Sequence, residues 1–213
     1  MKVLFATTNP AKVKLIYDKL QNMEIEVLTI KDLDFKLDVD ENGKDALENA
    51  YIKAKAYYDK TGIITIGMDN NLFFEGVEEK YQPGVYVRRV KGKELSDDEM
   101  ISYYSKLAHD FGGKIESCWV YGMVVYNGKN TKNLTWKKDK FYIVDTPSDK
   151  RNPGYPLDSI SINPALNKYF VDLTSEEKNI DESENTADVV VKFIVDSIKE
   201  FQKKWYTYRY AKF

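Results

Sequence analysis

The sequence predicts a mixed α/β protein in which a central mixed sheet is flanked by helices, and three observations support this class. A short apolar run at residues 2–6 leads through a tight turn into a stretch with helical spacing. Further apolar runs alternate with helical stretches as far as residue 111. Two strand-like stretches then follow each other across a turn-rich segment, at residues 116–126 and 133–144, and they are expected to form an antiparallel hairpin.

Three short strands are expected in the first third of the chain. They are the apolar runs at residues 2–6, 24–30 and 62–69. The helix after the first strand is expected to begin at Pro10, with Asn9 as its N-cap. Proline suits the first helical position because the backbone N–H that it lacks would have no partner within the helix there. A second helix is expected over residues 45–58, where apolar side chains recur at helical spacing after an acidic loop. The third strand is expected to end on Asp69.

The remaining elements are a third helix, the hairpin, a long loop and a final helix. Ser96 is expected to cap the third helix, because Glu99 three residues later completes a capping box. Residues 145–158 are rich in proline, glycine and aspartate, which indicates a loop. The final helix is expected over about residues 186–203. An aromatic and basic tail from about residue 202 to 213 is expected to pack as a strand or an irregular tail on the domain or on a dimer mate. The alternative is that its aromatic side chains stack on nucleic acid.

Length and composition bound the class of protein. The chain has 213 residues, of which 43% are hydrophobic, so it can bury one sizeable core or at most two small domains that share an interface. A single domain spanning residues 1–213 is expected. Its net charge of -2 gives no general surface for nucleic acid or anionic membranes. The first residues lack a signal-peptide pattern, and no run approaches the roughly 20 apolar residues of a membrane span. A cytoplasmic protein is therefore expected.

Cysteine and histidine are too scarce for several common kinds of site. Cys118 is the single cysteine, which excludes an intramolecular disulfide, and its apolar surroundings indicate a buried thiol. His109 is the single histidine, near the end of a polar helix, where a solvated or dipole-stabilised ring is expected. A His-rich zinc site cannot be built. A Ser-His-Asp hydrolase is not indicated, because the Gly-x-Ser-x-Gly motif is missing too.

A first candidate site lies at the turn between the first strand and the first helix. The stretch "ATTNPAK" supplies Thr7, Asn9 and Lys12. Free backbone N–H groups and the positive end of the helix dipole favour binding of an anion there. Lys12, in the first turn of the helix, can add a charge-assisted hydrogen bond to that anion. The alternative is an ordinary capped helix with a solvated lysine.

A second candidate group comes from the acidic loop and the helix after it. Asn49 and Lys53 are four residues apart and share a helix face, so they can offer an amide and an ammonium to a phosphate. Glu41, in the loop, is free to turn toward a metal. The alternative is a solvated acidic loop followed by a helix with ordinary pairs of side chains, Glu48 included.

A third candidate group surrounds Asp69. A carboxylate that leaves the carboxyl end of a buried strand lies at the edge where α/β sheets bind ligands. Asn70 follows it, and Arg88 and Arg89 lie beyond a Pro-Gly turn. Mg²⁺ prefers a few carboxylates together with phosphate oxygens and water, which Asp69 and Glu41 could supply.

The order and spacing of these groups resemble the inosine triphosphate pyrophosphatases. The family's Thr-x-Asn-x-x-Lys matches Thr7, Asn9 and Lys12. The family's Pro-Gly-Val-Tyr-Ser-Ala-Arg corresponds to "PGVYVRR" at residues 83–89. Further matches are "ENG" from Glu41, "ENA" from Glu48, "KA" from Lys53, "MDNNL" around Asp69 and "LTSEEKN" from Leu173. Together these motifs cover nearly the whole chain.

The resemblance implies an elongated two-lobed fold around a central nucleotide cleft, usually in a homodimer. It implies Mg²⁺-dependent cleavage of a nucleoside triphosphate between the α and β phosphates, which yields the monophosphate and pyrophosphate. Asp69 would help to place the metal and to orient or deprotonate the attacking water, Glu41 would bind the metal, and Lys53 would act at the phosphates. The implied substrate contacts are Thr7, Asn9, Lys12, Asn70, Arg89, Gly154, Tyr155, Lys178, Ser183 and Glu184.

The chain departs from the family pattern at three places. Met68 replaces the first aspartate of the family's Asp-Asp pair, so one carboxylate is lost. The family's Phe-Gly-Tyr-Asp-Pro appears as "PGYPLD", which keeps Gly154 and Tyr155 but places Pro156 at the aspartate position; Asp158 would substitute only after a shift of the loop. The family's Ser-His-Arg after the Lys-Asn motif is replaced by residues 182–184, "ESE".

The last departure motivates a hypothesis about the base. In the family, histidine and arginine donate hydrogen bonds to the 6-keto oxygen of the purine, whereas a glutamate such as Glu182 or Glu184 can only accept. A base with an amino group on its edge is then favoured over a keto purine, and an unmatched buried group changes preference by roughly tenfold to a hundredfold. Two alternatives stay open: another phosphoester or dinucleotide substrate, and a catalytically silent nucleotide-binding or interaction protein.

Overall fold

The computed structural model describes residues 1–7, 9–21, 23–177 and 184–210, and the chain divides into two compact units. The first unit contains Met1–Asn70, Tyr121–Trp136 and Ser183–Phe213. The second contains Asn71–Val120 and Lys137–Glu182. The prediction of one domain is not tested by this division and stays a prediction.

The first unit is built on a sheet centred on β1. Its elements are β1 (Lys2–Phe5), α1 (Pro10–Gln21), β2 (Glu26–Thr29), the 3-10 turn η1 (Ile30–Asp32), α2 (Ala46–Thr61), the first part of β3 (Thr65–Phe74), the last part of β6 (Lys114–Tyr126), most of β7 (Thr131–Lys137), and α5 (Glu184–Tyr210). Strand β1 pairs in parallel with β2 and with β3. On the other side of β3 lies β6, which also pairs with β7.

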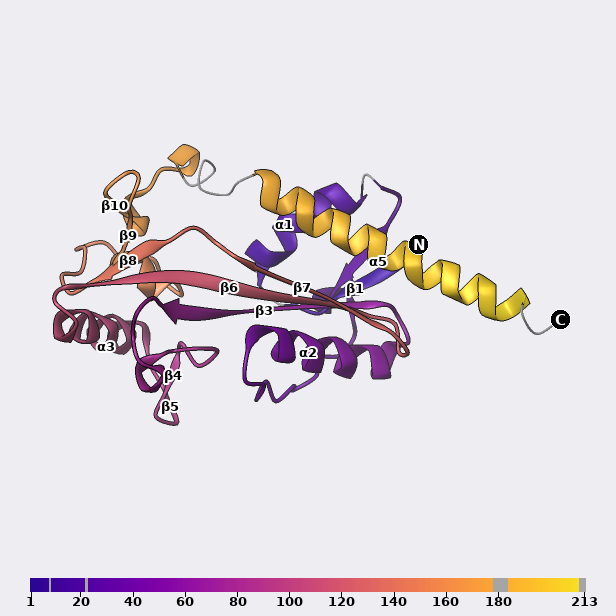
Figure 1. Cartoon of the computed structure of the whole chain (residues 1–213), viewed down its shortest axis with the longest axis horizontal. Coiled ribbons are helices and arrows are strands. Elements are labelled where there is room, and N and C mark those ends of the chain that lie inside the picture. The colour runs from indigo at the N-terminus through magenta and orange to yellow at the C-terminus, as the bar shows by residue number, and fades with distance from the viewer. Residues whose placement is uncertain (8, 22, 178–183, 211–213) are drawn as a thin grey trace. The chain divides into compact units, whose positions relative to one another are not determined.

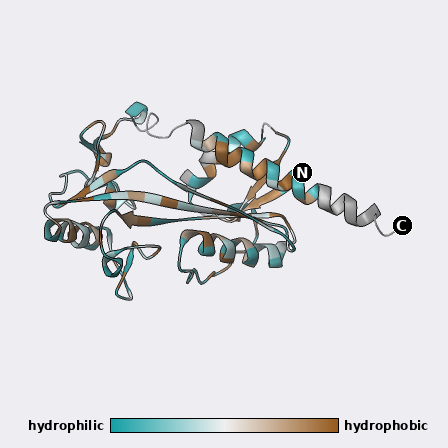
Figure 2. Ribbon diagram, in the orientation of Figure 1, coloured by the Kyte–Doolittle hydropathy of each residue, from teal (hydrophilic) through white to brown (hydrophobic). Residues whose placement is uncertain are grey.

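Alternation along β1 divides the core of the first unit between the two faces of its sheet. Val3 and Phe5 join a buried cluster with apolar side chains of α1 and α5, whereas Leu4 and Ala6 join another cluster with Tyr57 of α2. Figure 1 shows α1 and α5 on one side of these strands and α2 on the other. In Figure 2 the described part of α5 alternates between hydrophobic and hydrophilic residues, as an amphipathic helix does.

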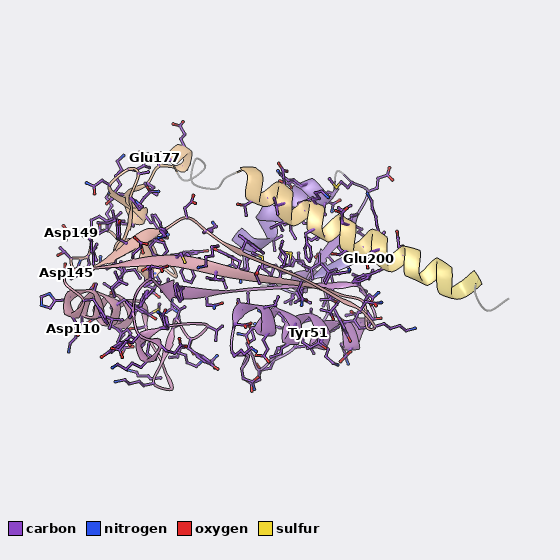
Figure 3. All side chains as sticks on the ribbon, viewed as in Figure 1. Tyr51, Asp110, Asp145, Asp149, Glu177 and Glu200 are labelled. Atoms are coloured by element: carbon purple, nitrogen blue, oxygen red, sulfur yellow. The ribbon has the colours of Figure 1, made fainter. Side chains whose placement is uncertain are left out.

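Two glycines allow α2 to lie unusually close to the sheet. A Cβ atom on Gly67 of β3 would lie 1.9 Å from the carbonyl oxygen of Ala50, and one on Gly122 of β6 would lie 2.5 Å from the backbone nitrogen of Leu47. Only residues without a side chain fit this approach. Further along α2, Tyr51 (Figure 3) packs edge-on against Tyr126, with ring centroids 5.7 Å apart. The start of α2 is therefore held directly against β3 and β6.

The second unit packs one helix against antiparallel strands. Its elements are the end of β3, η2 (Glu79–Tyr81), β4 (Arg89–Val90), β5 (Lys93–Glu94), α3 (Asp97–Asp110), the start of β6, β8 (Phe141–Val144), η3 (Pro156–Ser159), β9 (Ser161–Asn163), β10 (Lys168–Tyr169) and η4 (Phe170–Asp172). Strand β8 pairs antiparallel with β6 and β9, and β9 with β10. The buried face of α3 includes Met100, Tyr104 and Ala108.

The predicted fold class is confirmed, and so are most of the predicted elements. Helix α3 begins after Ser96 with the predicted capping box, in which Ser96 N donates to Glu99 Oε2 at 2.9 Å and Glu99 N donates to Ser96 Oγ at 3.3 Å. Helix α2 is capped by Asp45, whose side chain accepts from Glu48 N at 2.9 Å. Among the described helices none is long and apolar enough to cross a membrane.

Three boundaries were predicted wrongly. Strand β3 does not end on Asp69 but continues to Phe74, because the residues after Asn71 are again apolar, and Leu72 and Phe74 are buried. Residues 133–144 form two strands, β7 and β8, interrupted at the exposed charged residues 138–140. Helix α5 continues to Tyr210, through most of the segment expected to be a strand or irregular tail. Strands β4, β5, β9 and β10 were not predicted, since each has only two or three residues.

Candidate functional site

Asp69 lies within β3, just beyond the end of its parallel pairing with β1. The last pair of that ladder is Phe5 with Ile66, and β1 ends at Phe5. Asp69 is therefore at the carboxyl edge of β1 although its own strand continues. Its side chain shares a strand face with Gly67, which contacts α2, and it is 17% exposed. Asp69 therefore lies at the carboxyl edge of the parallel strands, as predicted. The prediction that β3 itself ends at Asp69 is wrong.

The carboxylate of Asp69 receives one polar group from each of two helices. Asn49 of α2 donates from Nδ2 to Asp69 Oδ2 at 3.0 Å. Lys12 of α1 places Nζ 3.5 Å from Asp69 Oδ1 and also donates to the carbonyl oxygen of Met68 at 3.3 Å. Both donors come from the first turns of their helices. The carboxylate is thus held in one orientation from both sides.

The loop before α2 holds the side chain of Asn49 in place. Its side chain is almost fully buried, and Oδ1 accepts from Gly43 N at 2.8 Å. A Cβ on Gly43 would lie 2.7 Å from the same Oδ1 atom, so the loop can make this contact only with glycine. The sequence predicted that Asn49 offers its amide to a phosphate, whereas the structure commits this amide to Asp69. Neither Gly43 nor this role of Asn49 was predicted.

Lys53 and Glu41 form the second ion pair of the group. Lys53 Nζ lies 2.8 Å from Glu41 Oε2, and Lys53 follows Asn49 by one turn on the same face of α2, as predicted. Glu48, by contrast, accepts from Lys44 N at 2.8 Å and belongs to the cap of the helix. We call Lys12, Glu41, Asn49, Lys53 and Asp69 the Asp69 cluster.

The electrostatics of Lys12 connect the members of the Asp69 cluster. Burial lowers the pKa of Lys12, and the attraction of Asp69 opposes this shift. The charge of Lys53 lowers the pKa of Lys12 further, and that of Glu41 raises it. Asp69, Lys53 and Glu41 therefore all act on the charge of Lys12. Two ammonium groups and two carboxylates balance formally, so an anionic ligand would have to arrive with a cation or displace the carboxylates from the lysines.

The turn between β1 and α1 has the conformation expected of a capped helix start. The buried hydroxyl of Thr7 accepts from Asn9 N at 3.1 Å, and the carbonyl oxygen of Asn9 accepts from Val13 N at 3.2 Å. The first helical N–H groups are thereby directed beyond the end of β1, where Lys12 also reaches.

Met68 and Asn70 flank Asp69 and share the other strand face. Met68 is 1% exposed and lies in the apolar cluster that includes Ile66 and Met123. Met68, which corresponds to the first aspartate of the family pattern, is thus a core residue in this chain. Asn70 is half-buried. Its predicted contact with substrate stays a prediction.

Arg89, Gly154 and Tyr155 belong to the second unit. Arg89 begins β4 and is exposed, with its guanidinium carbon 5.9 Å from the ring centroid of Tyr86. Gly154 has φ 83°, a left-handed conformation that favours glycine, and Tyr155 is half exposed. Asp158, considered as a substitute for the missing loop aspartate, instead accepts from Asn152 Nδ2 at 2.8 Å.

Some predicted residues fall outside the described structure. Lys178 and Ser183 lie outside the described residues, as does Glu182. Glu184 is the first residue of α5, and its side chain is outside the described part. The sequence-based hypothesis about the base therefore stays a prediction.

The predicted solvated state of His109 agrees with the structure. Its ring is exposed near the end of α3, with Nδ1 3.2 Å from Oδ2 of Asp145 (labelled in Figure 3). The hydrogen bond from His109 lowers the pKa of Asp145. Cys118 is buried as predicted, and burial raises the pKa of its thiol.

The Asp69 cluster has a donor set that fits a hard cation. Within the described ranges no three His, Cys, Asp or Glu side chains gather around one point, so the protein alone offers no closed metal cage there. Glu41 and Asp69 supply carboxylate oxygens, and Mg²⁺ is commonly bound by one or two carboxylates together with substrate phosphates and water. The cluster fits Mg²⁺ held jointly with a phosphate ligand.

Known proteins resemble this chain in sequence and in fold. The model of the Ham1 family matches residues 3–186. A dITP/XTP pyrophosphatase from Thermoanaerobacter pseudethanolicus is 29% identical over 204 residues, which cover 96% of this chain and 100% of the relative. One from Aquifex aeolicus is 32% identical over 188 residues, covering 84% and 89%. A solved HAM1 protein from Coxiella burnetii matches the fold with a TM-score of 0.69 at 21% identity, over 90% of this chain and 99% of that one.

Proposed function

We propose, from the premise that the chain belongs to the Ham1 family, that it hydrolyses a nucleoside triphosphate to the monophosphate and pyrophosphate. The observation that carries this proposal is the convergence on Asp69 of Lys12 and Asn49 from two helix N-terminal turns, with the Lys53–Glu41 pair beside them. Phosphoryl transfer needs mainly positioning and charge neutralisation, and these residues supply both. The relatives named dITP/XTP pyrophosphatase support the reaction type.

Lys12 and Lys53 act on the phosphates in this proposal. Each ammonium is paired with a carboxylate in the structure. When a triphosphate binds, the ammonium groups move to phosphate oxygens, which carry more charge than one carboxylate oxygen. The turn of Thr7 and Asn9 adds backbone N–H groups at the start of α1. The same movement frees Glu41 and Asp69.

Mg²⁺ is the cation proposed for the freed carboxylates. Glu41 and Asp69 would hold it, and when bound it would neutralise phosphate charge and favour ionisation of nearby water. Asn49 keeps Asp69 oriented by donating to Oδ2, while Oδ1, which lies 3.5 Å from Lys12 Nζ, would serve the cation and the attacking water. In that orientation Asp69 can accept the proton of an attacking water.

Asp69→Asn tests the proposal directly. The amide keeps the shape of the side chain but cannot accept a proton or hold Mg²⁺ as a carboxylate does, so pyrophosphate release should fall at least about a hundredfold. Nucleotide binding should stay within about threefold. The measurement is pyrophosphate release and nucleotide affinity for the variant beside the unmodified protein.

Asp59→Asn is the matched control for this experiment. Asp59 is an exposed carboxylate of α2 that pairs with Lys55, in the same unit but outside the Asp69 cluster. Its variant should keep full activity. Unchanged turnover by Asp69→Asn would contradict the role given to Asp69.

The base preference is proposed to have moved away from keto purines, on the ground that "ESE" at residues 182–184 replaces Ser-His-Arg. Rates on ITP, XTP, dATP, dCTP and dUTP test this point. A clear preference for ITP would contradict it while leaving the pyrophosphatase proposal intact.

A catalytically silent nucleotide-binding protein is the second candidate function. The observation that favours it is Met68, which is buried in the core where the family has a carboxylate. The same assay separates the two functions, since a silent protein binds nucleotide and releases no pyrophosphate from any of the five triphosphates.

A further inference from the structure

One face of α2 contacts the loop before it at three successive turns. The helix residues are four apart, which places their side chains on one face, and in chain order they are Asn49, Lys53 and Tyr57. Their partners in the loop, in the same order, are Gly43, Glu41 and Leu37. These partners occur in reverse order along the chain, so the loop runs antiparallel to the helix that it precedes. We call residues 37–43 the helix-bound loop.

Tyr57 anchors the end of the helix-bound loop that begins at Leu37. Leu37 N donates to the hydroxyl oxygen of Tyr57 at 3.2 Å. The ring of Tyr57 is buried and stacks on the ring of Phe35, with ring centroids 6.5 Å apart. A polar contact and an apolar one thus fix the chain a few residues before Glu41.

Asn49 joins the other end of the helix-bound loop to Asp69. Its amide oxygen accepts from Gly43 N at 2.8 Å, and its amide nitrogen donates to Asp69 Oδ2 at 3.0 Å. An aspartate at this position could not donate, and an aliphatic side chain could make neither bond. Since Asn49 is 2% exposed, losing either bond would leave a buried polar group unpaired. One amide therefore connects the backbone two residues beyond Glu41 to the carboxylate of Asp69.

Glu41 lies between the two anchors and is itself held by Lys53, whose Nζ is 2.8 Å from Glu41 Oε2. All of these residues belong to the first unit, within Met1–Asn70. The side chains of Glu41 and Asp69 are both partly exposed, so a cation can reach them while the backbone on either side of Glu41 is held. The contacts of α2 therefore set how far apart the two carboxylates lie.

We propose that Asn49 and Tyr57 are positioning residues for the divalent cation, because they hold Glu41 at a fixed separation from Asp69. This inference rests on the proposed function, in which these two carboxylates bind Mg²⁺. Mg²⁺ requires near-ideal octahedral geometry with short bonds to oxygen, whereas Ca²⁺ is larger and accepts more variable arrangements. A loop that is held at both ends therefore favours Mg²⁺ over Ca²⁺, and a loosened loop loses this preference.

Asn49→Ala removes both hydrogen bonds of the amide. The dissociation constant for Mg²⁺ should rise about tenfold, because residues that orient metal ligands contribute to affinity on this scale. The constant for Ca²⁺ should rise less than about threefold, because Ca²⁺ adapts to a changed separation of the carboxylates. Mn²⁺ is the probe in this measurement: electron paramagnetic resonance gives its free concentration while Mg²⁺ or Ca²⁺ displaces it from the full-length protein.

Two further variants make the test specific. Tyr57→Phe removes only the hydroxyl and keeps the ring that packs in the core, so it should weaken Mg²⁺ binding about threefold while the bond from Gly43 to Asn49 remains. Asn163→Ala is the matched control, since Asn163 is another buried asparagine, whose Oδ1 accepts from two backbone N–H groups in the second unit. It should lower Tm and leave both cation constants unchanged.

The result that overturns the inference is distinct from failure of the proposed function. A folded Asn49→Ala protein whose constants for Mg²⁺ and Ca²⁺ are unchanged, or rise by the same factor, overturns it. If Asn49→Ala does not fold, an unchanged Mg²⁺ constant for Tyr57→Phe overturns it instead. An unmodified protein that binds no Mn²⁺ also overturns it. If the unmodified protein binds Mn²⁺ but releases no pyrophosphate, the proposed function fails, while the cation constants, measured without turnover, still decide the inference.

Discussion

Asp69 and Met68 are neighbours in β3, and the alternation of the strand gives them opposite environments. Asp69 faces α2 and is held by Asn49 and Lys12, whereas Met68 faces the helices α1 and α5 and is buried with Ile66. One residue is therefore available to a ligand and the other is part of the core.

Met68→Ala should lower the free energy of unfolding by about 2 to 5 kcal/mol, because the side chain is fully buried and leaves a cavity. Met68→Leu keeps the volume and should cost less than about 1.5 kcal/mol. Urea denaturation of both variants measures the difference. Equal stability of the two would show that Met68 is not a packing residue.

At the scale of elements, the first turn of each helix determines what the helix can do. Helix α2 lies against β3 and β6 through Gly67 and Gly122, and this approach brings Asn49 to Asp69. Helix α3 begins with a capping box, and Asp97 in the same turn reaches Gly154. Helix starts therefore supply the polar groups that contact Asp69 and the carboxylate that accepts from Gly154 N.

Gly122→Ala should push α2 away from β6, since the added Cβ would lie 2.5 Å from the backbone of Leu47. We expect a loss of about 1 to 3 kcal/mol in unfolding free energy, together with reduced pyrophosphate release, because Asn49 moves with the helix. Gly62→Ala is the control. Gly62 has a positive φ of 68° but open space around it, so its variant should lose about 1 kcal/mol of stability and keep activity.

Glu99 should make the stability of α3 depend on acid pH. Its hydrogen bonds from Lys93 and from Ser96 lower its pKa to about 2. A carboxylate whose folded pKa is lowered stabilises the fold above the unfolded value of 4.5, and this contribution disappears as the pH falls through the folded value. Glu99→Ala should therefore lower Tm at pH 7 and make no difference near pH 2. A constant Tm difference across this range would contradict the capping role.

At the scale of the whole molecule, the two units contribute different candidate groups. The first unit contains the Asp69 cluster, and the second contains the ion pair of Arg88 with Asp97 and the hydrogen bond from Gly154 N to Asp97.

The homodimer implied by the family resemblance is also a prediction at this scale. Light scattering of the purified protein should give twice the monomer mass of 24.7 kDa. A mass equal to the monomer at micromolar concentration would contradict it.

Much of the fold and part of the candidate site could be predicted from the sequence, because the signals are local. Asn9 before Pro10, Ser96 with Glu99, and the helical spacing of Asn49 and Lys53 depend on contacts within one or two turns. The family motifs also identified Glu41, Asp69 and Lys12 as residues that belong together. The structure places Glu41 beside Lys53 and Asp69 beside Lys12.

The rest depended on contacts between segments distant in the sequence. Asp69 was expected at a strand end because two asparagines follow it, but pairing with β6 carries β3 on to Phe74. Nothing local showed that Asn49 would be buried against Asp69, or that Asp97 would join Arg88 to Gly154. By itself, the sequence determined which residues carry charge and where helices begin. Only the tertiary structure decided which charges meet, because that depends on backbone approaches such as those at Gly67 and Gly122.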